Sequence, residues 1–96
     1  MIKHIVMWKL KEGALEKGLS QFKAMLEEMQ GTVKGLKMLE IGVNSTPFDT
    51  SCDLVLYTVF DSYEALTLFQ NHPKHLRIKD AAKEWVLHRH QVDYTC

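Results

Sequence analysis

The chain has 96 residues, of which 46% are hydrophobic and 25% are charged, and its twelve lysines and arginines balance twelve aspartates and glutamates. A chain without net charge has no electrostatic attraction to a phosphate backbone or an anionic membrane surface, so neither nucleic acid nor a membrane is an expected partner. The length predicts a single domain over residues 1–96. The two cysteines, Cys52 and Cys96, form no CxxC pair, which favours a reducing compartment with the cytoplasm as the default location.

A strand and then a helix are predicted in the first third of the chain. In residues 2–10 the side chains alternate, so Ile5 and Met7 point one way and His4, Val6 and Trp8 the other. From about Ala14 the apolar spacing changes to fours and threes, which is typical of a helix with one buried stripe. Gly31 is expected to end this helix in the left-handed conformation. The stripe consists of Leu15, Leu19, Phe22, Leu26 and Met29.

Two strands are predicted in the middle of the chain, joined by a loop. The first covers residues 36–43, and residues 44–51 consist of turn-forming types that indicate a loop. The second covers residues 53–60 and is apolar almost throughout, which is typical of a strand covered on both faces.

Helices and a last strand are predicted for the remaining third. Asp61 and Glu64 have the spacing of a capping box, with Asp61 as the N-cap of a helix that reaches Asn71. A further helix is expected over residues 73–85, because proline is tolerated in a first turn. Its expected buried residues are Leu76, Ile78, Ala82 and Trp85. The closing strand, residues 87–94, places His88, His90, Val92 and Tyr94 on one face.

The element order β-α-β-β-α-β predicts an α+β fold whose second sheet face needs a partner. Right-handed crossovers place both helical segments on one side of a four-stranded sheet. The strands at 2–10 and 53–60 carry large apolar residues on both faces, so the uncovered side would expose a large apolar patch. Burying about 800 Å² against a second copy is worth on the order of 20 kcal/mol before the cost of association. We therefore expect a homodimer joined through the sheet face.

Two short motifs in the second half are distinctive, and four other stretches accompany them in order along the chain. The motifs are Asn71-His72-Pro73-Lys74-His75-Leu76 and Val92-Asp93-Tyr94. The other stretches are Met1-Ile2-Lys3-His4-Ile5-Val6, Leu39-Glu40-Ile41-Gly42-Val43-Asn44, Asp53-Leu54-Val55-Leu56-Tyr57 and Phe60-Asp61-Ser62-Tyr63-Glu64-Ala65-Leu66. In these residues the chain resembles the stress-responsive A/B barrel (Dabb) family over essentially its whole length. The resemblance implies a ferredoxin-like protomer with a four-stranded antiparallel sheet, helices on one face, and a dimeric α/β barrel.

The resemblance implies less about activity than about fold. Many members of the family have no assigned activity, some plant members are associated with stress tolerance, and one branch comprises polyketide cyclases. In the cyclases a tyrosine lies six residues before the second histidine of a His-Pro-x-His motif, and these two groups transfer protons. Here that histidine is His75, but the tyrosine position is Phe69, which has no hydroxyl. His4 matches a first-strand histidine that lines the cyclase pocket.

The candidate catalytic residues are His75 and His4, and each has a structural alternative. Imidazole has an ordinary pKa of about 6.5, so His75 is suited to general acid or base catalysis. His72 and His75 lie on one side of a helical turn, and capping or a buried hydrogen bond would explain them equally. His4 is either a satisfied core residue or a polar group facing His75 across a pocket between sheet and helices.

The other candidate ligand-binding residues are mostly aromatic and would either line such a pocket or fill it. They are Val6, Trp8, Phe22, Tyr57, Phe69 and His72. His88 and His90 have a spacing that can hold a metal, but no third ligand is identifiable, so no metal site is predicted. No Gly-rich phosphate loop or dinucleotide fingerprint is present, and no cofactor is expected.

Three hypotheses about function remain open at this point. The protein is a non-catalytic dimer that binds a small apolar ligand, a cofactor-free lyase or cyclase that uses His75, or a cofactor-free monooxygenase like those of a related dimeric barrel superfamily. A sealed core around Trp8 and Phe69 would favour a protein without a reaction, whereas an open cleft that reaches His75 would favour an enzyme.

Overall fold

The computed structural model describes residues 1–46, 48 and 51–96, and its elements follow the order expected from the sequence. Pro47, Asp49 and Thr50, which belong to the predicted loop 44–51, lie outside the described residues. The elements are β1 (Ile2–Leu10), α1 (Leu15–Lys17), a π-helical segment (Gly18–Phe22), α2 (Lys23–Glu27), β2 (Leu36–Val43), β3 (Leu54–Phe60), α3 (Tyr63–Gln70), α4 (Pro73–Ala82) and β4 (Val86–Thr95).

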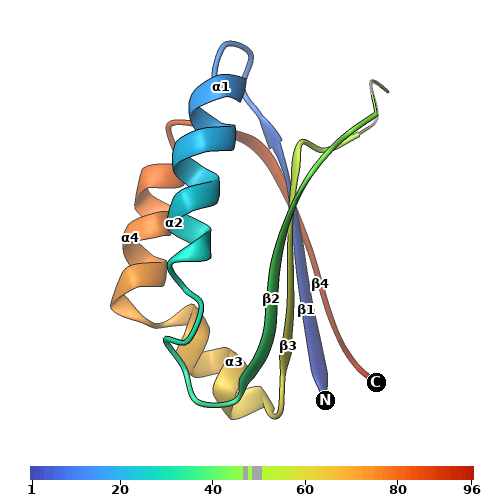
Figure 1. The fold of residues 1–96 in the computed structure, drawn as a ribbon, viewed down its shortest axis with the longest axis vertical. Helices are drawn as coiled ribbons and strands as arrows, with labels where there is room; N and C mark the ends of the chain where they lie inside the picture. The colour runs from blue at the N-terminus through green and yellow to red at the C-terminus, as the bar shows by residue number, and fades with distance from the viewer. Residues whose placement is uncertain (47, 49–50) are drawn as a thin grey trace.

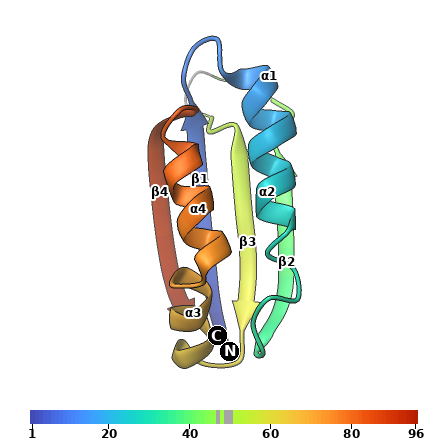
Figure 2. The ribbon, with the colours of Figure 1, turned by 90° about the vertical axis from the view of Figure 1, so that its left-hand side faces the viewer.

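The four strands form one antiparallel sheet in the order β2-β3-β1-β4, and all helices cover the same face (Figure 1). Figure 2 shows α2 and α4 running side by side over the sheet, with α3 near one end. This arrangement is the predicted α+β, ferredoxin-like architecture. None of the helices in the described part of the chain is long and apolar enough to cross a membrane.

Alternation along the two central strands separates a helix-facing side of the sheet from an outer side. The even-numbered residues of β1 and β3 are all buried under the helices: Ile2, His4, Val6, Trp8, Leu10, Leu54, Leu56, Thr58 and Phe60. The odd-numbered residues face the other way, and Ile5 lies between Tyr57 of β3 and Val92 of β4. The face predicted for His88, His90, Val92 and Tyr94 is this outer side, because they pair with Lys9, Met7, Ile5 and Lys3.

The first helix follows the predicted stripe from Leu19 onward, where Leu19 is half-buried against the core. Phe22, Leu26 and Met29 are buried, whereas Leu15 is 48% exposed, so its predicted burial is wrong. The π-helical segment explains the difference, because its wider turns shift the helical register between Leu15 and Phe22. Gly31 has the expected positive φ, 76°, just beyond the helix end.

The starts of α3 and α4 are both set by side-chain caps. Ser62, rather than the predicted Asp61, is the N-cap of α3, and its hydroxyl accepts a hydrogen bond from the Ala65 N–H at 3.1 Å. The capping-box prediction for Asp61 is therefore wrong, because Ser62 is the extended residue that immediately precedes the helix. His72 caps α4 by accepting from the Lys74 N–H at 3.1 Å, with Pro73 in the first turn.

Helix α4 turns a different face to the sheet from the one predicted in its first half. Ile78 and Ala82 are buried, and Trp85 is buried just after the helix ends. Leu76 is 49% exposed, so its predicted burial is wrong. A residue two positions before Ile78 lies on the opposite side of a helix, which explains why both cannot face the sheet.

Candidate ligand-binding site

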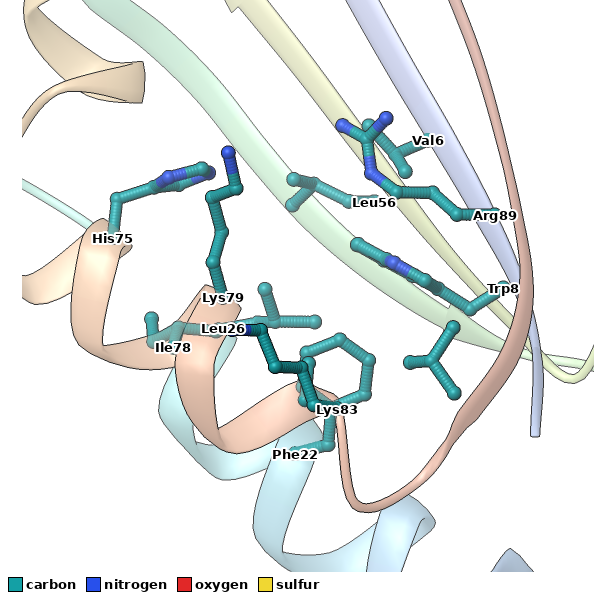
Figure 3. A pocket seen from close by; sticks show the side chains of 12 residues that line it. Val6, Trp8, Phe22, Leu26, Leu56, His75, Ile78, Lys79, Lys83 and Arg89 are labelled. Atoms are coloured by element: carbon teal, nitrogen blue, oxygen red, sulfur yellow. The ribbon is translucent and has the colours of Figure 1, made fainter. Parts of the chain in front are cut away.

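A cavity of about 230 Å³ lies between the helix-facing side of the sheet and the helical layer (Figure 3). Strands β1, β3 and β4 form its floor. The π-helical segment with α2, and α4, form its roof. The lining residues are Val6, Trp8, Phe22, Leu26, Leu56, His75, Ile78, Lys79, Ala82, Lys83, Val86 and Arg89.

Aromatic packing fixes one end of the cavity. The rings of Trp8 and Phe22 meet edge to face with centroids 4.9 Å apart, and Phe22 also contacts Trp85 at 5.9 Å. Trp8 therefore belongs to the wall and leaves the cavity open, which decides between the two alternatives for this residue. Phe69 is fully buried beside the cavity, where it packs against Phe60 at 5.1 Å.

His75 brings an uncharged imidazole to the cavity wall. Burial is the largest cause that lowers the pKa of His75 from 6.5 to about 4, and electrostatic interactions with Lys79, His4 and Arg89 lower it further. Its Nδ1 atom is buried and makes no hydrogen bond to any residue that the structure describes. At neutral pH the ring is therefore a neutral hydrogen-bonding group in a largely apolar wall.

His4 lies behind the cavity and is held by an aspartate from the edge strand. The histidine is 1% exposed, and its Nδ1–H donates to Asp93 Oδ1 at 2.5 Å. The other oxygen of Asp93 accepts from Gln91 Nε2 at 2.9 Å, and Gln91 Oε1 accepts from Arg89 Nη2 at 2.6 Å. A line of polar contacts therefore runs along the inner face of β4 from the cavity wall to His4.

The structure brings together only part of the predicted site. Val6, Trp8, Phe22 and His75 line one cavity. His4 and His75 do not face each other across open space, because the Phe69 ring contacts both, with centroids at 6.4 Å and 5.2 Å. Of the two alternatives for His4, the contacts with Asp93 and Phe69 fit a satisfied core residue.

Two other candidates lie elsewhere. Tyr57 is on the outer face of the sheet, with Lys3 Nζ 5.6 Å from its ring centroid, so its predicted place in the sheet–helix pocket is wrong. His72 is the cap of α4 and does not line the cavity. The structure thus supports the capping alternative for His72 and separates it from His75, three residues later.

Of the charged residues at or beside the cavity, Lys79, Arg89 and Asp93 were not recognised in the sequence, and neither was Lys83 at its rim. Strand parity could have found two of them, because positions 89, 91 and 93 must face the helices when 88, 90 and 92 face outward. Helical spacing could have found Lys79, since it follows His75 by four residues on α4.

Comparison with known proteins agrees with this fold. The family model of the stress responsive A/B barrel domain (Dabb) matches residues 2–96 of the sequence. The chain therefore belongs to this family. The predicted family membership is therefore confirmed. No functionally curated protein matches the chain significantly.

Solved structures extend the comparison to the whole length of the chain. A dimeric protein of unknown function with a ferredoxin-like fold from Bacteroides fragilis is 25% identical, with a TM-score of 0.87 over 99% of this chain and 95% of that one. A Dabb family protein from Mesorhizobium loti is 20% identical, with a TM-score of 0.80 over 99% and 95%. A putative antibiotic biosynthesis monooxygenase from Nitrosomonas europaea is 18% identical, with a TM-score of 0.82 over 100% and 98%.

Proposed function

We propose that this protein binds a small, largely apolar organic molecule in the cavity between the sheet and the helices. The observation that carries the proposal is the open volume of about 230 Å³ beside Trp8 and Phe22, between the sheet and both helical segments. Protein interiors leave few voids larger than a water molecule. A dry cavity of about 150 Å³ is sufficient to bind benzene, so this one has room for a ring with a short substituent.

The test is saturable binding of a neutral probe, 4-propylbenzyl alcohol, followed by two-dimensional NMR and calorimetry. We expect one site per chain, with the largest shifts at Trp8, Phe22 and Ile78. Ala82 lines the cavity on α4, so Ala82→Leu should fill part of the volume and weaken binding by about tenfold or more, the equivalent of 1.4 kcal/mol.

The matched control is Ala24→Leu, the same substitution at an exposed position of α2. It should bind the probe as the unmodified protein does. Absence of saturable binding to the unmodified protein, or equal weakening by both substitutions, would argue against a ligand site in the cavity.

A second candidate function is proton transfer by His75, and the neutral imidazole in the cavity wall favours it. A histidine with a pKa of about 4 keeps its basic form at acidic pH, where an ordinary histidine is protonated. Phe69 offers no hydroxyl at the place where the cyclases have tyrosine, so this candidate relies on His75 without that partner.

The pH dependence of a proton abstraction tests this candidate. The probe is 5-nitrobenzisoxazole, whose C–H proton is lost as its N–O bond breaks. Because the base is active only when deprotonated, the protein-dependent rate should rise through about pH 4 and be level by pH 6, and His75→Gln should abolish it. His72→Asn, which retains a capping side chain, is the control. Full activity in His75→Gln would exclude His75 as the base. A midpoint near pH 6.5 that His75→Gln abolishes would mean that His75 is the base but keeps an ordinary pKa.

The monooxygenase hypothesis receives no separate support. The likeness to the Nitrosomonas europaea protein, at 18% identity, is a likeness of fold. The reaction of that protein is therefore not part of the proposal.

We also propose that the protein forms a homodimer through the outer face of the sheet. The helices leave this face uncovered (Figure 1), and Ile5, Met7 and Val92 lie on it. The similar proteins from Bacteroides fragilis and Thermobifida fusca are described as dimeric. Burial of this face against a second copy would remove an apolar patch from water.

A further inference from the structure

All charged side chains that line the cavity are basic. Eight of the twelve lining residues are apolar, and the other four are His75, Lys79, Lys83 and Arg89, so no carboxylate lines the cavity within the described part of the chain. The chain as a whole has as many acidic as basic residues, so composition alone does not produce this separation.

The cations differ in whether they already have a partner. Lys83 lies 3.4 Å from Asp80 and is 80% exposed, at the rim. The Lys79 ammonium makes no ion pair or hydrogen bond with residues 1–46, 48 and 51–96. Arg89 contacts the neutral amide of Gln91, whereas the nearest carboxylate, Asp93, is engaged by His4 and Gln91.

Lys79 and Arg89 come from different elements but reach the same part of the cavity. Figure 3 shows the Lys79 ammonium beside the His75 ring on the helix side of the cavity, and the Arg89 guanidinium on the strand side, near Val6, with open space between them. Both charges, together with His4 from β1, lower the pKa of His75, whose ring also contacts Phe69 of α3. Burial also lowers the pKa of Arg89, which remains a cation with part of its hydration removed.

Building on the proposed function, we infer that the ligand is an organic carboxylate whose anionic group lies between Lys79 and Arg89 and whose apolar body lies against Trp8 and Phe22. A guanidinium presents paired N–H donors that match the two oxygens of a carboxylate. Lys79 adds a second positive charge, and the neutral His75 is available as a donor. The aromatic end of the cavity is mainly the apolar ring surface of Trp8 and Phe22, so it accommodates the apolar body.

The experiment compares two probes with the same body, 4-propylbenzoate and 4-propylbenzyl alcohol, by calorimetry at pH 7. We expect the carboxylate to bind about tenfold tighter than the alcohol, because charge-assisted hydrogen bonds replace neutral ones. Lys79→Gln and Arg89→Gln should each reduce this preference severalfold, because each removes one of the two charges that hold the carboxylate.

The matched control is Lys74→Gln, which removes the same charge from an exposed position of α4 outside the cavity. It should retain the full preference for the carboxylate. An independent readout is the His75 titration followed by NMR. A carboxylate bound beside the ring should raise the pKa of His75 from about 4, and the alcohol should not.

The outcomes separate this inference from the proposed function. Equal binding of both probes would overturn the inference and leave an apolar ligand site in place. Absence of binding by either probe would overturn both. A preference for the carboxylate that survives in Lys79→Gln and Arg89→Gln, or that Lys74→Gln removes equally, would show that the anion lies elsewhere and would also overturn the inference.

Discussion

His4 shows how one buried polar residue depends on a distant partner. An imidazole that is 1% exposed is compatible with a stable core only when its N–H is satisfied, and Asp93, 89 residues later, supplies the acceptor. The contact exists because β1 and β4 are paired, with His4 directly opposite Asp93. The residue thus joins the edge strand to the core beside the cavity.

Removing this acceptor should destabilise the fold. We expect Asp93→Ala to lower the free energy of unfolding by about 1–3 kcal/mol, because the buried His4 N–H loses its partner. Chemical denaturation provides the measurement. The double variant Asp93→Ala/His4→Phe should lose less stability than the sum of the two single variants, because both substitutions remove the same contact.

The control for this pair is Asp80→Ala, at a carboxylate that is 82% exposed and lies 3.4 Å from Lys83 Nζ. Its effect should lie within about 0.5 kcal/mol. If Asp93→Ala were as mild as Asp80→Ala, the hydrogen bond to His4 would contribute little, and the histidine would be stabilised by packing against Phe60 and Phe69 alone.

At the scale of elements, local patterns were sufficient for the order and type of structure but not for every face. The alternation in β1 correctly assigned His4, Val6 and Trp8 to one side, because that strand mixes polar and apolar residues. β3 is apolar on both faces, so its pattern does not say which side is inside, and Tyr57 was placed in the wrong layer. A run of apolar residues therefore predicts a strand, but it does not predict which face of the sheet each side chain is on.

The helical errors have a similar origin. The register of Leu15 depends on a π-helical segment at Gly18, which is buried so closely against Leu10 that a Cβ would overlap the leucine side chain. That approach is a tertiary contact and leaves no periodic signal. Leu76 and Ile78 are both apolar, and only packing against the sheet decides which of them is covered.

The site illustrates the same limit on a larger scale. Trp8, Phe22 and His75 could be predicted because each belongs to a face defined by its own element. The presence of both Lys79 and Arg89 at one cavity could not be predicted, because it depends on how α4 lies over β4. Neither charged residue is unusual in its local sequence.

For the whole molecule, the outer face of the sheet is a surface that the helices of the same chain leave uncovered. Ile5 lies at its centre on β1, paired with Tyr57 on one side and Val92 on the other, and Met7 and Val92 are 40% and 50% exposed. Lysines occupy both ends of the same strand face, at positions 3 and 9. An apolar centre with a charged rim is the usual anatomy of a protein–protein interface.

A lysine at this centre should therefore separate the subunits. In the proposed dimer, Ile5→Lys would place a charge in an apolar interface without a partner, at a cost of at least about 2.7 kcal/mol, which raises the dissociation constant about 100-fold. Sedimentation velocity over a range of protein concentrations measures the change. Leu68→Lys makes the same kind of substitution on α3, at a side chain that is 61% exposed on the opposite side of the molecule, and should leave the dimer intact. An unmodified protein that remains monomeric at micromolar concentration would mean that this apolar face is stable in water, and a dimer that persists in Ile5→Lys would mean that the copies meet through another surface.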